Sequence, residues 1–394
     1  MVEQERFRCT ILRGGTSKGI YLLRNDLPED PELRDRVILA IFGSPDIRQI
    51  DGLGGSDLLT SKVAIVGRAT RPDADVDYTF GQVGITLPKV DYSGNCGNIS
   101  SGVGPFAIYQ SLVDAVEPMT RVRIHMTNTK RVLVAEVPVK NGEVVIEGDY
   151  RIDGCPGTGA KIMIDWSDTG GAVTDKVLPT GNTKDVLKVE GIGDVTTSIV
   201  DAGNPIAFIH AESVGMKGTE TPFEIDGDGA LLEKLEKIRS VAAEKIGFVK
   251  NWRDATVKSQ YAPFITMVNS PRSYTDYTTG KIVDAGSFDV LARLLFNQRM
   301  HKIYPGSGTV CTGTAAKIPG TIVNDLIPKA AKTAEVIRIG HPAGVIPIEV
   351  SVEMDGKKPL LKRAAIGRTA RIIMEGYVFV KKSILQGTGG RFQA

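Results

Sequence analysis

The chain has 394 residues, of which 42% are hydrophobic and 24% are charged, and its 48 basic and 46 acidic residues give a net charge of +2. This composition is ordinary for a globular protein, and a balanced charge without basic runs argues against nucleic acid as a partner. No apolar run approaches the roughly 20 residues that a membrane-spanning helix needs, so no membrane partner is expected. A chain of this length is expected to fold as two domains.

The N-terminal residues and the cysteines favour a cytoplasmic location. Residues 1–6 lack the basic and apolar regions of a signal peptide. The four cysteines lie far apart, with no CxxC pair, which suits reduced thiols. They are Cys9, Cys96, Cys155 and Cys311.

The first glycine-rich loop lies between two predicted strands. Residues 7–12 alternate as a strand does, residues 13–19 form the loop, and residues 20–23 form the next strand. The loop is not a GxxxxGK[ST] phosphate loop, because that spacing is absent and a strand follows. Its glycines, with Thr16 and Ser17, could hold a small carboxylate. A plain flexible hairpin is the alternative.

A lysine stands at the start of a later strand. An amphipathic helix is predicted over residues 31–42, a second glycine-rich loop over 49–56, and a strand over 60–66 that contains Lys62. If Lys62 faces a dry cleft, desolvation favours its neutral amine, which can act as a base. Alternatively, the side chain simply reaches solvent.

The segment around Cys96 is the most distinctive in the chain. Residues 91–102 surround this one thiol with glycines, serines and asparagines, and an apolar run compatible with a helix follows over residues 103–116. The pattern predicts a tight turn that delivers Cys96 to the first turn of a helix. Unpaired N–H groups there would attract an anion and favour the thiolate. A buried structural cysteine with an asparagine cap is the alternative.

Alternating segments continue to a looser region that we take as the domain boundary. The further predicted strands of the first half are residues 77–84, 121–126, 131–139 and 144–147. Residues 154–180 are richer in proline, glycine and aspartate. The expected domains are therefore 1–184 and 185–370, with a C-terminal strand at about 371–388 that packs back onto the first.

The second half repeats the order of the first. Residues 197–209 again follow the pattern of strand, glycine loop and strand, and residues 306–316 again set a cysteine, Cys311, among small residues. The repeat indicates two similar α/β halves with a ligand-binding cleft between them.

The remaining segments of the second half are assigned by periodicity. Helices are predicted over residues 230–246 and 288–300, the second ending at His301. The predicted strands are residues 265–268, 345–353 and 359–380.

No cofactor or metal motif is present in the sequence. The GxGxxG fingerprint and the GxSxG elbow are missing, and the four histidines show no HxH or HExxH spacing. We therefore expect no cofactor and no metal. Acid–base chemistry by a thiol and an amine on a carboxylate-bearing substrate remains.

Six motifs in order resemble the PrpF family, which is similar in fold to diaminopimelate epimerase. The resemblance spans about Arg8 to Val380 and rests on residues 13–19, 49–52, 60–62, 93–98, 319–321 and 340–344. It implies an α/β (α+β) protein of two pseudo-symmetric domains. Each domain would wrap its strands around a central helix, with the active site in the cleft between them. It also implies a homodimer or homotetramer.

The resemblance implies an isomerase that needs no cofactor. It would move a double bond by an allylic 1,3-proton shift in an unsaturated di- or tricarboxylic acid, such as 3-methylitaconate to 2,3-dimethylmaleate. Isomerisation of 2-methylaconitate and tautomerisation of 4-oxalomesaconate are alternatives within the family. A non-catalytic polycarboxylate binder, or an accessory protein of an aconitase-like enzyme, is an alternative of another class.

By the same resemblance, Lys62 and Cys96 are the proton-transfer residues. Lys62 would act as base at one allylic carbon and Cys96 would handle the proton at the other, or the two roles are exchanged. A carbon acid beside a carboxylate is weakly acidic, so fixed donors must hold the dienolate-like charge. Epimerases of this fold use a second cysteine, but the residues flanking Cys311 differ from theirs, so Cys311 is expected to line the site instead. The expected substrate contacts are Thr16, Ser17, Gly97, Asn98, His301 and Cys311.

Overall fold

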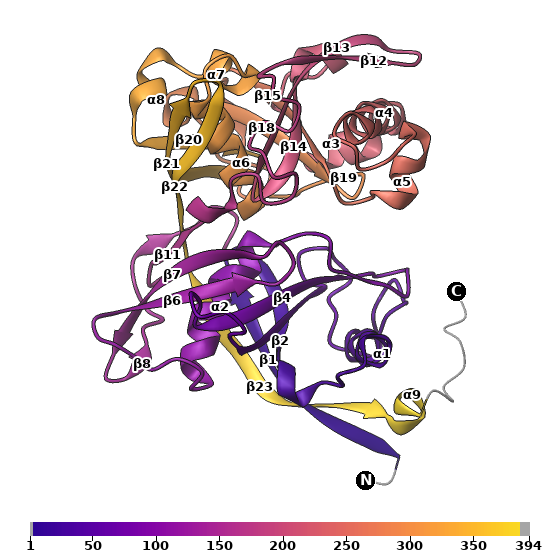
Figure 1. Ribbon diagram of the computed structural model, residues 1–394, viewed down its shortest axis with the longest axis vertical. Helices are drawn as coiled ribbons and strands as arrows, with labels where there is room; N and C mark the ends of the chain where they lie inside the picture. The colour runs from indigo at the N-terminus through magenta and orange to yellow at the C-terminus, as the bar shows by residue number, and fades with distance from the viewer. Residues whose placement is uncertain (1–2, 387–394) are drawn as a thin grey trace. The chain divides into compact units, whose positions relative to one another are not determined.

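The computed structural model of the chain describes residues 3–386 and divides into two compact units (Figure 1). Unit 1 comprises Met1–Ile164 and Arg368–Ala394, and unit 2 comprises Asp165–Gly367. The division falls at Ile164 rather than at residue 184, because the segment that follows hydrogen-bonds within unit 2. The Gly171 N–H donates to the Asp201 carbonyl, and the Asp201 N–H donates to the Val177 carbonyl, each at 2.9 Å.

Unit 1 contains most of the first half of the chain and one C-terminal strand. Its strands are β1 (Gln4–Gly14), β2 (Ser17–Leu23), β3 (Lys62–Arg68), β4 (Val76–Val83), β5 (Val90–Asp91), β6 (Met119–Met126), β7 (Arg131–Lys140), β8 (Glu143–Val144), β9 (Tyr150–Arg151), β10 (Thr158–Gly159), β11 (Ile162–Asp165, ending at the boundary) and β23 (Ala370–Lys381). Its helices are α1 (Pro31–Phe42), α2 (Gly97–Tyr109) and α9 (Lys382–Leu385).

The strands of unit 1 surround helix α2 (Figure 1). β1 pairs antiparallel with β2 and with β23, β2 runs parallel to β3, β3 antiparallel to β4, β4 parallel to β6, and β6 antiparallel to β7. Every α2 residue from Gly97 to Ile108 is buried. A helix that is buried on all sides belongs to a core, so α2 is the central helix of this unit.

Small residues allow the strands to approach α2 closely. A Cβ atom on Gly102 would lie 2.3 Å from the Tyr21 hydroxyl, and one on Gly104 would lie 2.8 Å from Cγ2 of Val137. Larger residues at either position would therefore displace the neighbouring strand. The glycines of this segment are required by packing as well as by the turn that precedes the helix.

Helix α1 covers the outside of the unit 1 sheet. Asp30 caps its first turn by accepting from the Leu33 N–H at 2.7 Å, and Gly43 ends it in the left-handed conformation with φ 71°. Its apolar side, which includes Ile38 and Phe42, packs in one buried cluster with residues of β1, β2 and β3. This helix has the bounds predicted from the sequence.

Unit 2 contains the rest of the chain. Its strands are β12 (Asp185–Val189), β13 (Gly193–Ala202), β14 (Asn204–His210), β15 (Phe264–Asn269), β16 (Tyr274–Thr275), β17 (Ile282–Val283), β18 (Val290–Phe296), β19 (Arg299–Met300), β20 (Val336–His341), β21 (Gly344–Asp355) and β22 (Lys358–Arg368, ending at the boundary). Its helices are α3 (Pro222–Gly227), α4 (Gly229–Lys245), α5 (Ala255–Lys258), α6 (Gly306–Lys317), α7 (Ile322–Leu326) and α8 (Lys329–Thr333).

Unit 2 repeats the strand pairing of unit 1. β13 is antiparallel to β14, β14 parallel to β15, β15 antiparallel to β18, β18 parallel to β20, and β20 antiparallel to β21. Helix α6 takes the central place, because its residues from Gly306 to Ala316 are all buried and it contacts β13, β14, β20 and β21. The internal repeat read from the sequence is therefore confirmed.

Helix α4 covers the outside of unit 2. Asp228 caps it by accepting from the Leu231 N–H at 2.9 Å. Its buried residues Leu235, Ile238 and Ala242 pack in one cluster with Ile265 of β15. Among residues 3–386, no helix is long and apolar enough to cross a membrane.

The helix predicted over residues 288–300 is wrong. This segment forms β18 and β19, joined by a turn in which Asn297 and Gln298 both have positive φ, 52° and 53°. Residues of β18 are buried on both faces of the sheet. Leu294 lies against Gly308 of α6, and Leu295 belongs to the buried cluster that includes Leu235 of α4. A fully buried strand shows no alternation, so its leucines and alanine resemble a helix by periodicity alone.

Candidate active site

Cys96 is the N-cap residue of the central helix α2. It is 8% exposed and has extended backbone angles, φ −124° and ψ 102°. Its carbonyl accepts from both the Ser100 N–H and the Ser100 hydroxyl, each at 2.9 Å. The Cys96 side chain itself accepts no capping hydrogen bond from this helix end. The predicted delivery of Cys96 to the start of a helix is confirmed, and the asparagine cap is not formed.

The turn between β1 and β2 packs against the start of α2. A Cβ atom on Gly14 would lie 2.5 Å from the Asn98 carbonyl oxygen and 3.3 Å from Cα of Ile99. Gly15 faces the Asn98 side chain. The Arg13 guanidinium fixes the turn by donating to the carbonyls of Gly15, at 2.8 Å, and Thr369, at 3.0 Å. The first glycine-rich loop is thus a rigid hairpin turn at the helix terminus.

Three buried side-chain atoms around this turn accept or donate no hydrogen bond within residues 3–386. They are Oγ1 of Thr16, Oγ of Ser17 and Oδ1 of Asn98. Leaving a buried polar atom unsatisfied costs about 1–3 kcal/mol. Such atoms beside a helix N-terminus are suited to a polar, anionic ligand that satisfies them.

Lys62 begins β3 and its side chain is 5% exposed, so it does not reach solvent. Nζ donates to Oε1 of Gln82 at 3.1 Å and lies 5.5 Å from the centre of the Phe80 ring. The Gln82 amide nitrogen donates to the Ser61 carbonyl at 2.9 Å, which turns its oxygen toward the amine. Among the described residues, no carboxylate pairs with Lys62.

Lys62 and α2 are neighbours through Gly19. The parallel register pairs Ile20 with Val63, which sets Lys62 beside Gly19. A Cβ atom on Gly19 would lie 3.0 Å from the Lys62 carbonyl oxygen and 2.8 Å from Cδ1 of Ile99 in the first turn of α2. The starts of β2, β3 and α2 therefore lie close together. Ser17 begins β2, Lys62 begins β3, and Cys96 is the N-cap of α2.

Two buried tyrosines, Tyr21 and Tyr78, carry hydroxyls whose pKa values respond to Cys96. The Tyr21 hydroxyl donates to the Ile99 carbonyl at 2.5 Å. Burial, and then the charge at Cys96, raise the pKa of Tyr21 well above its ordinary value, and the same two causes act in the same order on the pKa of Tyr78. Both hydroxyls therefore stay neutral, and neither competes with the thiol as an acid at neutral pH.

Arg368 is a residue of this site that sequence reasoning missed. It is 3% exposed, and its Cδ lies 3.1 Å from the position of a Cβ atom on Gly15. Burial lowers its pKa to about 10, while Tyr150 and Cys96 act in the opposite direction. The guanidinium thus remains charged at neutral pH. The sequence did offer a signal for this residue, because Arg368 directly follows the apolar run 364–367. An arginine buried at such a position is a candidate for a functional site.

The structure brings together six of the eight predicted site residues in unit 1. They are Thr16, Ser17, Lys62, Cys96, Gly97 and Asn98. His301 and Cys311 belong to unit 2. His301 is buried directly after β19, where its N–H donates to the Leu294 carbonyl at 2.8 Å and its Nδ1 accepts from the Ile303 N–H at 3.3 Å.

Cys311 does not occupy the position in unit 2 that Cys96 has in unit 1. The N-cap of α6 is Pro305, and Cys311 lies in the middle of the helix with its thiol donating to the Val200 carbonyl at 3.1 Å. Burial, and then the charge of Asp201, raise its pKa well above the ordinary value. The thiol is therefore held protonated in the core, which is unfavourable for proton abstraction.

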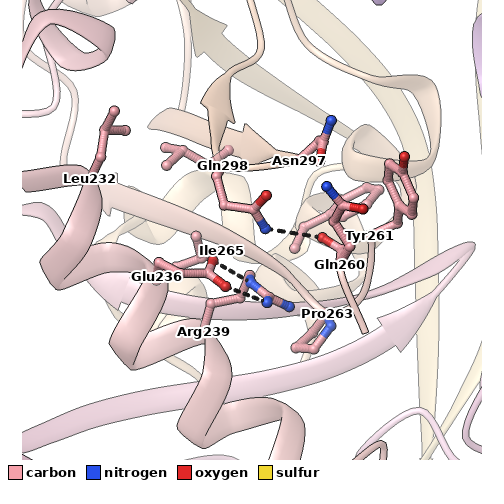
Figure 2. Close-up of a pocket in the computed structure, with 11 residues that line it drawn as sticks. Leu232, Glu236, Arg239, Gln260, Tyr261, Pro263, Ile265, Asn297 and Gln298 are labelled. Carbon is pink, nitrogen blue, oxygen red and sulfur yellow. Dashed lines mark hydrogen bonds and ion pairs between the residues drawn. The ribbon is translucent and has the colours of Figure 1, made fainter. Parts of the chain in front are cut away.

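A separate pocket lies in unit 2, between α4 and the strands β15 and β18 (Figure 2). Its two charged residues bind each other: Arg239 donates to both Glu236 oxygens, at 2.6 and 2.7 Å, and also to the Ser259 and Ala262 carbonyls. Because the charges of Arg239 and Glu236 are paired with each other, neither side chain is available to react with a ligand in this pocket. Among residues 3–386, no three His, Cys, Asp or Glu side chains are grouped to hold a metal ion.

A protein-family model matches nearly the whole chain and identifies its family. Residues 4–381 match the family model described as PrpF protein. The chain belongs to the PrpF family.

Named relatives of this PrpF-family chain are isomerases. The 3-methylitaconate isomerase of Eubacterium barkeri is 56% identical over 385 residues, which cover 98% of this chain and 100% of the relative. The 4-oxalomesaconate tautomerase of Pseudomonas putida is 40% identical over 384 residues, covering 98% and 99%. The PrpF-family chain is thereby placed among isomerases.

Solved structures confirm the expected α/β epimerase-like fold of the PrpF-family chain. The crystal structure of a methylitaconate-delta-isomerase matches with a TM-score of 0.82 and 55% identity, covering 100% of this chain and 99% of that one. A hydroxyproline epimerase from Agrobacterium vitis matches with a TM-score of 0.59 and 9% identity, covering 96% and 93%. This second likeness concerns the fold alone.

Proposed function

We propose that the protein moves a carbon–carbon double bond in an unsaturated di- or tricarboxylate by allylic 1,3-proton transfer, with Lys62 and Cys96 as the two proton carriers. The observation that supports this most is the meeting of the starts of β2, β3 and α2. There a buried amine and a buried thiol lie in one unit, beside three polar atoms that no residue of the described chain satisfies. The proposed substrate is 3-methylitaconate, because the 3-methylitaconate isomerase of Eubacterium barkeri is 56% identical to this chain, against 40% for the 4-oxalomesaconate tautomerase.

The reaction balances with these two groups alone. The neutral Lys62 amine takes the proton from C3 of 3-methylitaconate, which is both allylic and next to a carboxylate. The C–H electron pair becomes the new C2–C3 double bond as the old one opens toward the methylene carbon. The Cys96 thiol gives that carbon a proton, and the methylene becomes the new methyl group of 2,3-dimethylmaleate. Proton exchange with water then resets the ammonium and the thiolate.

Fixed donors stabilise the charge that develops on the carboxylate during proton removal. The N–H groups of Gly97 and Asn98 lie in the first turn of α2, where such groups have no partner within the helix. The hydroxyls of Thr16 and Ser17 add donors from the facing turn. Preorganised donors of this kind act on the transition state with little reorganisation. His301 is proposed as a further substrate contact. Cys311 is not included, because it is buried in the core of unit 2 with its thiol bonded to the Val200 carbonyl.

A proton NMR time course in deuterated water tests the proposal. Wild-type protein is given 3-methylitaconate, itaconate, 2-methylaconitate and 4-oxalomesaconate in separate reactions. We expect double-bond migration in 3-methylitaconate with deuterium entering the new methyl group. Migration only in 2-methylaconitate or 4-oxalomesaconate would show that the proposed substrate is wrong but that the proposed reaction type is right. Binding of these acids without migration or exchange would support a non-catalytic binder or accessory protein instead.

The protein is further proposed to act in the cytoplasm as a homodimer or homotetramer. The thiols of all four cysteines are free, as suits a reducing compartment. Strand β23 carries large apolar side chains that are 45–52% exposed, and self-association would bury them. These are Ile373, Tyr377 and Phe379. Light scattering after size exclusion tests the assembly, and a monomer that Phe379→Glu leaves unchanged would contradict it.

A further inference from the structure

Arg368 lies at the junction of the two features that form the candidate site. It approaches Gly15 in the turn between β1 and β2, since a Cβ atom there would meet its Cδ at 3.1 Å. The same Cβ atom would meet the Asn98 side chain of α2. The arginine is therefore close to the turn between β1 and β2 and to Asn98 at the start of α2.

The nearby arginine Arg13 has a different task. Its guanidinium donates to the carbonyls of Gly15 and Thr369, so it fixes the turn onto the strand that follows Arg368. The Gly15 N–H donates to the same Thr369 carbonyl at 2.9 Å, which completes the attachment. Arg13 thereby holds the turn that carries Thr16 and Ser17 against the backbone of Thr369, the residue next to Arg368.

Charge and hydrogen-bonding capacity at this point match a carboxylate. The α2 N-terminus contributes N–H groups and the positive end of the helix dipole. Thr16 and Ser17 contribute two hydroxyls without partners within residues 3–386. An arginine adds a planar fork of donors that fits the two oxygens of a carboxylate. Burial strengthens such a bond, because water does not compete for it.

We propose that Arg368 binds one carboxylate of the substrate and so makes the site selective for acids with two or more carboxylates. This inference rests on the proposed function and names a specificity residue for it. Held by Arg368, the turn and α2, the substrate presents its allylic carbons to Lys62 and Cys96. An arginine that only stabilised the fold would show no preference for the charge of a ligand.

The test measures binding of saturated analogues, which cannot be isomerised. Titration calorimetry gives the Kd of methylsuccinate, with two carboxylates, and of 2-methylbutyrate, with one, for wild type and for Arg368→Gln and Arg368→Lys. Arg293→Gln is the matched control. Arg293 is also buried with its pKa lowered to about 10, and it donates to the Glu220 and Ala292 carbonyls in unit 2.

We expect Arg368→Gln to weaken methylsuccinate binding by about 10- to 100-fold, as for the loss of hydrogen bonds to a charged group. Its Kd for 2-methylbutyrate should change much less, so the ratio of the 2-methylbutyrate Kd to the methylsuccinate Kd should fall. For Arg368→Lys this ratio should lie between those of wild type and Arg368→Gln. Arg293→Gln should retain the wild-type ratio. If Arg368→Gln does not fold, a reduced ratio in Arg368→Lys carries the same conclusion.

Equal ratios in wild type and in Arg368→Lys or Arg368→Gln would overturn the inference, and so would a wild type that binds methylsuccinate no better than 2-methylbutyrate. The proposed function is judged separately by turnover. If wild type isomerises no acid but binds methylsuccinate through Arg368, the inference stands and the isomerase proposal fails. If wild type isomerises 3-methylitaconate and Arg368→Gln leaves KM unchanged, the isomerase stands and the inference fails.

Discussion

Gly15 and Asn98 approach each other so closely that a Cβ atom on Gly15 would lie 2.5 Å from Oδ1 of Asn98. Gly15 also has φ +53°, in the left-handed region that side chains disfavour. Unit 2 repeats the arrangement, because Gly203, with φ +78°, packs against Ser307 in the first turn of α6. A glycine turn held against the start of a central helix is thus a shared device of both units, and in unit 1 it carries Thr16 and Ser17.

Substituting alanine at Gly15 should therefore disable the site. Gly15→Ala forces the turn or the Asn98 side chain to move, and we expect at least about a tenfold lower kcat/KM for 3-methylitaconate, since small displacements of a positioned substrate have large effects on rate. Gly94→Ala is the control, since Gly94 belongs to the Cys96 segment and has no atom within 4 Å of its Cβ position. Equal losses in both variants would contradict this explanation.

Removing the Lys62 amine should abolish proton transfer at one allylic carbon. Lys62→Ala is expected to lower kcat by about 10²- to 10⁴-fold, the usual contribution of a general base. The measurement is migration and deuterium uptake followed by NMR. Gln82→Leu provides a graded comparison, because Lys62 then loses its 3.1 Å hydrogen bond but keeps its amine. Migration at the wild-type rate in Lys62→Ala would move the base to another residue.

Substituting Cys96 should abolish activity, whereas substituting Cys155, a cysteine outside the candidate site, should not. Cys96→Ser should lose migration and deuterium exchange, because a serine hydroxyl is a far weaker acid at the same position. Cys155→Ser should retain both, since that partly exposed thiol makes a long hydrogen bond of 3.8 Å to the neighbouring Pro156 carbonyl and is not part of the candidate site. If Cys96→Ser still exchanges deuterium at one carbon, Lys62 works alone at that carbon.

Substituting Cys311 in unit 2 should lower stability without abolishing proton exchange. Cys311→Ala removes the thiol's bond to the Val200 carbonyl and leaves a small cavity in the core of unit 2, so it should lower the melting temperature. Because the thiol is held protonated, solvent exchange into the substrate should continue in the folded variant. A folded Cys311→Ala that loses exchange as fully as Cys96→Ser would show that the second cysteine transfers a proton.

The sequence predicted features that depend on local pattern. Small residues around Cys96 followed by an apolar run required a turn and a helix, and the structure has both. Helix α1 was also predictable, since its aspartate cap and terminal glycine are local signals. The internal repeat was visible as an order of segments, and the strand pairing confirms it.

What the sequence did not predict depends on tertiary environment. The segment at β18 was assigned as a helix because burial on both faces removes alternation. The sequence segments around Cys311 and Cys96 have similar composition, which suggested equivalent positions. In the structure, Cys96 caps the start of α2 but Cys311 lies in the middle of α6. Arg368 was missed because only the folded chain brings it beside Gly15, more than 350 positions earlier.

Asp77 should make the stability of unit 1 sensitive to acid. Its carboxylate accepts from Arg24 at 2.9 Å and from the Thr70 N–H at 3.2 Å, and lies 2.8 Å from Nδ1 of His125. Burial alone would raise its pKa, but the hydrogen bonds from His125, Arg24 and Thr70 lower it below the ordinary value. A carboxyl group whose pKa falls on folding stabilises the fold above its unfolded pKa, about 3.9, and this stabilisation is lost as the pH drops through the folded value.

Asp77→Asn should therefore melt below wild type at neutral pH, and the difference should shrink as the pH falls from about 5 toward 2. Melting curves of both proteins across this range give the measurement. Asp73→Asn is the matched control, because Asp73 is exposed and pairs with Arg71 at the surface, where an ion pair contributes little. A difference between wild type and Asp77→Asn that stays constant down to pH 2 would show that the carboxylate's charge is not what stabilises this part of the fold.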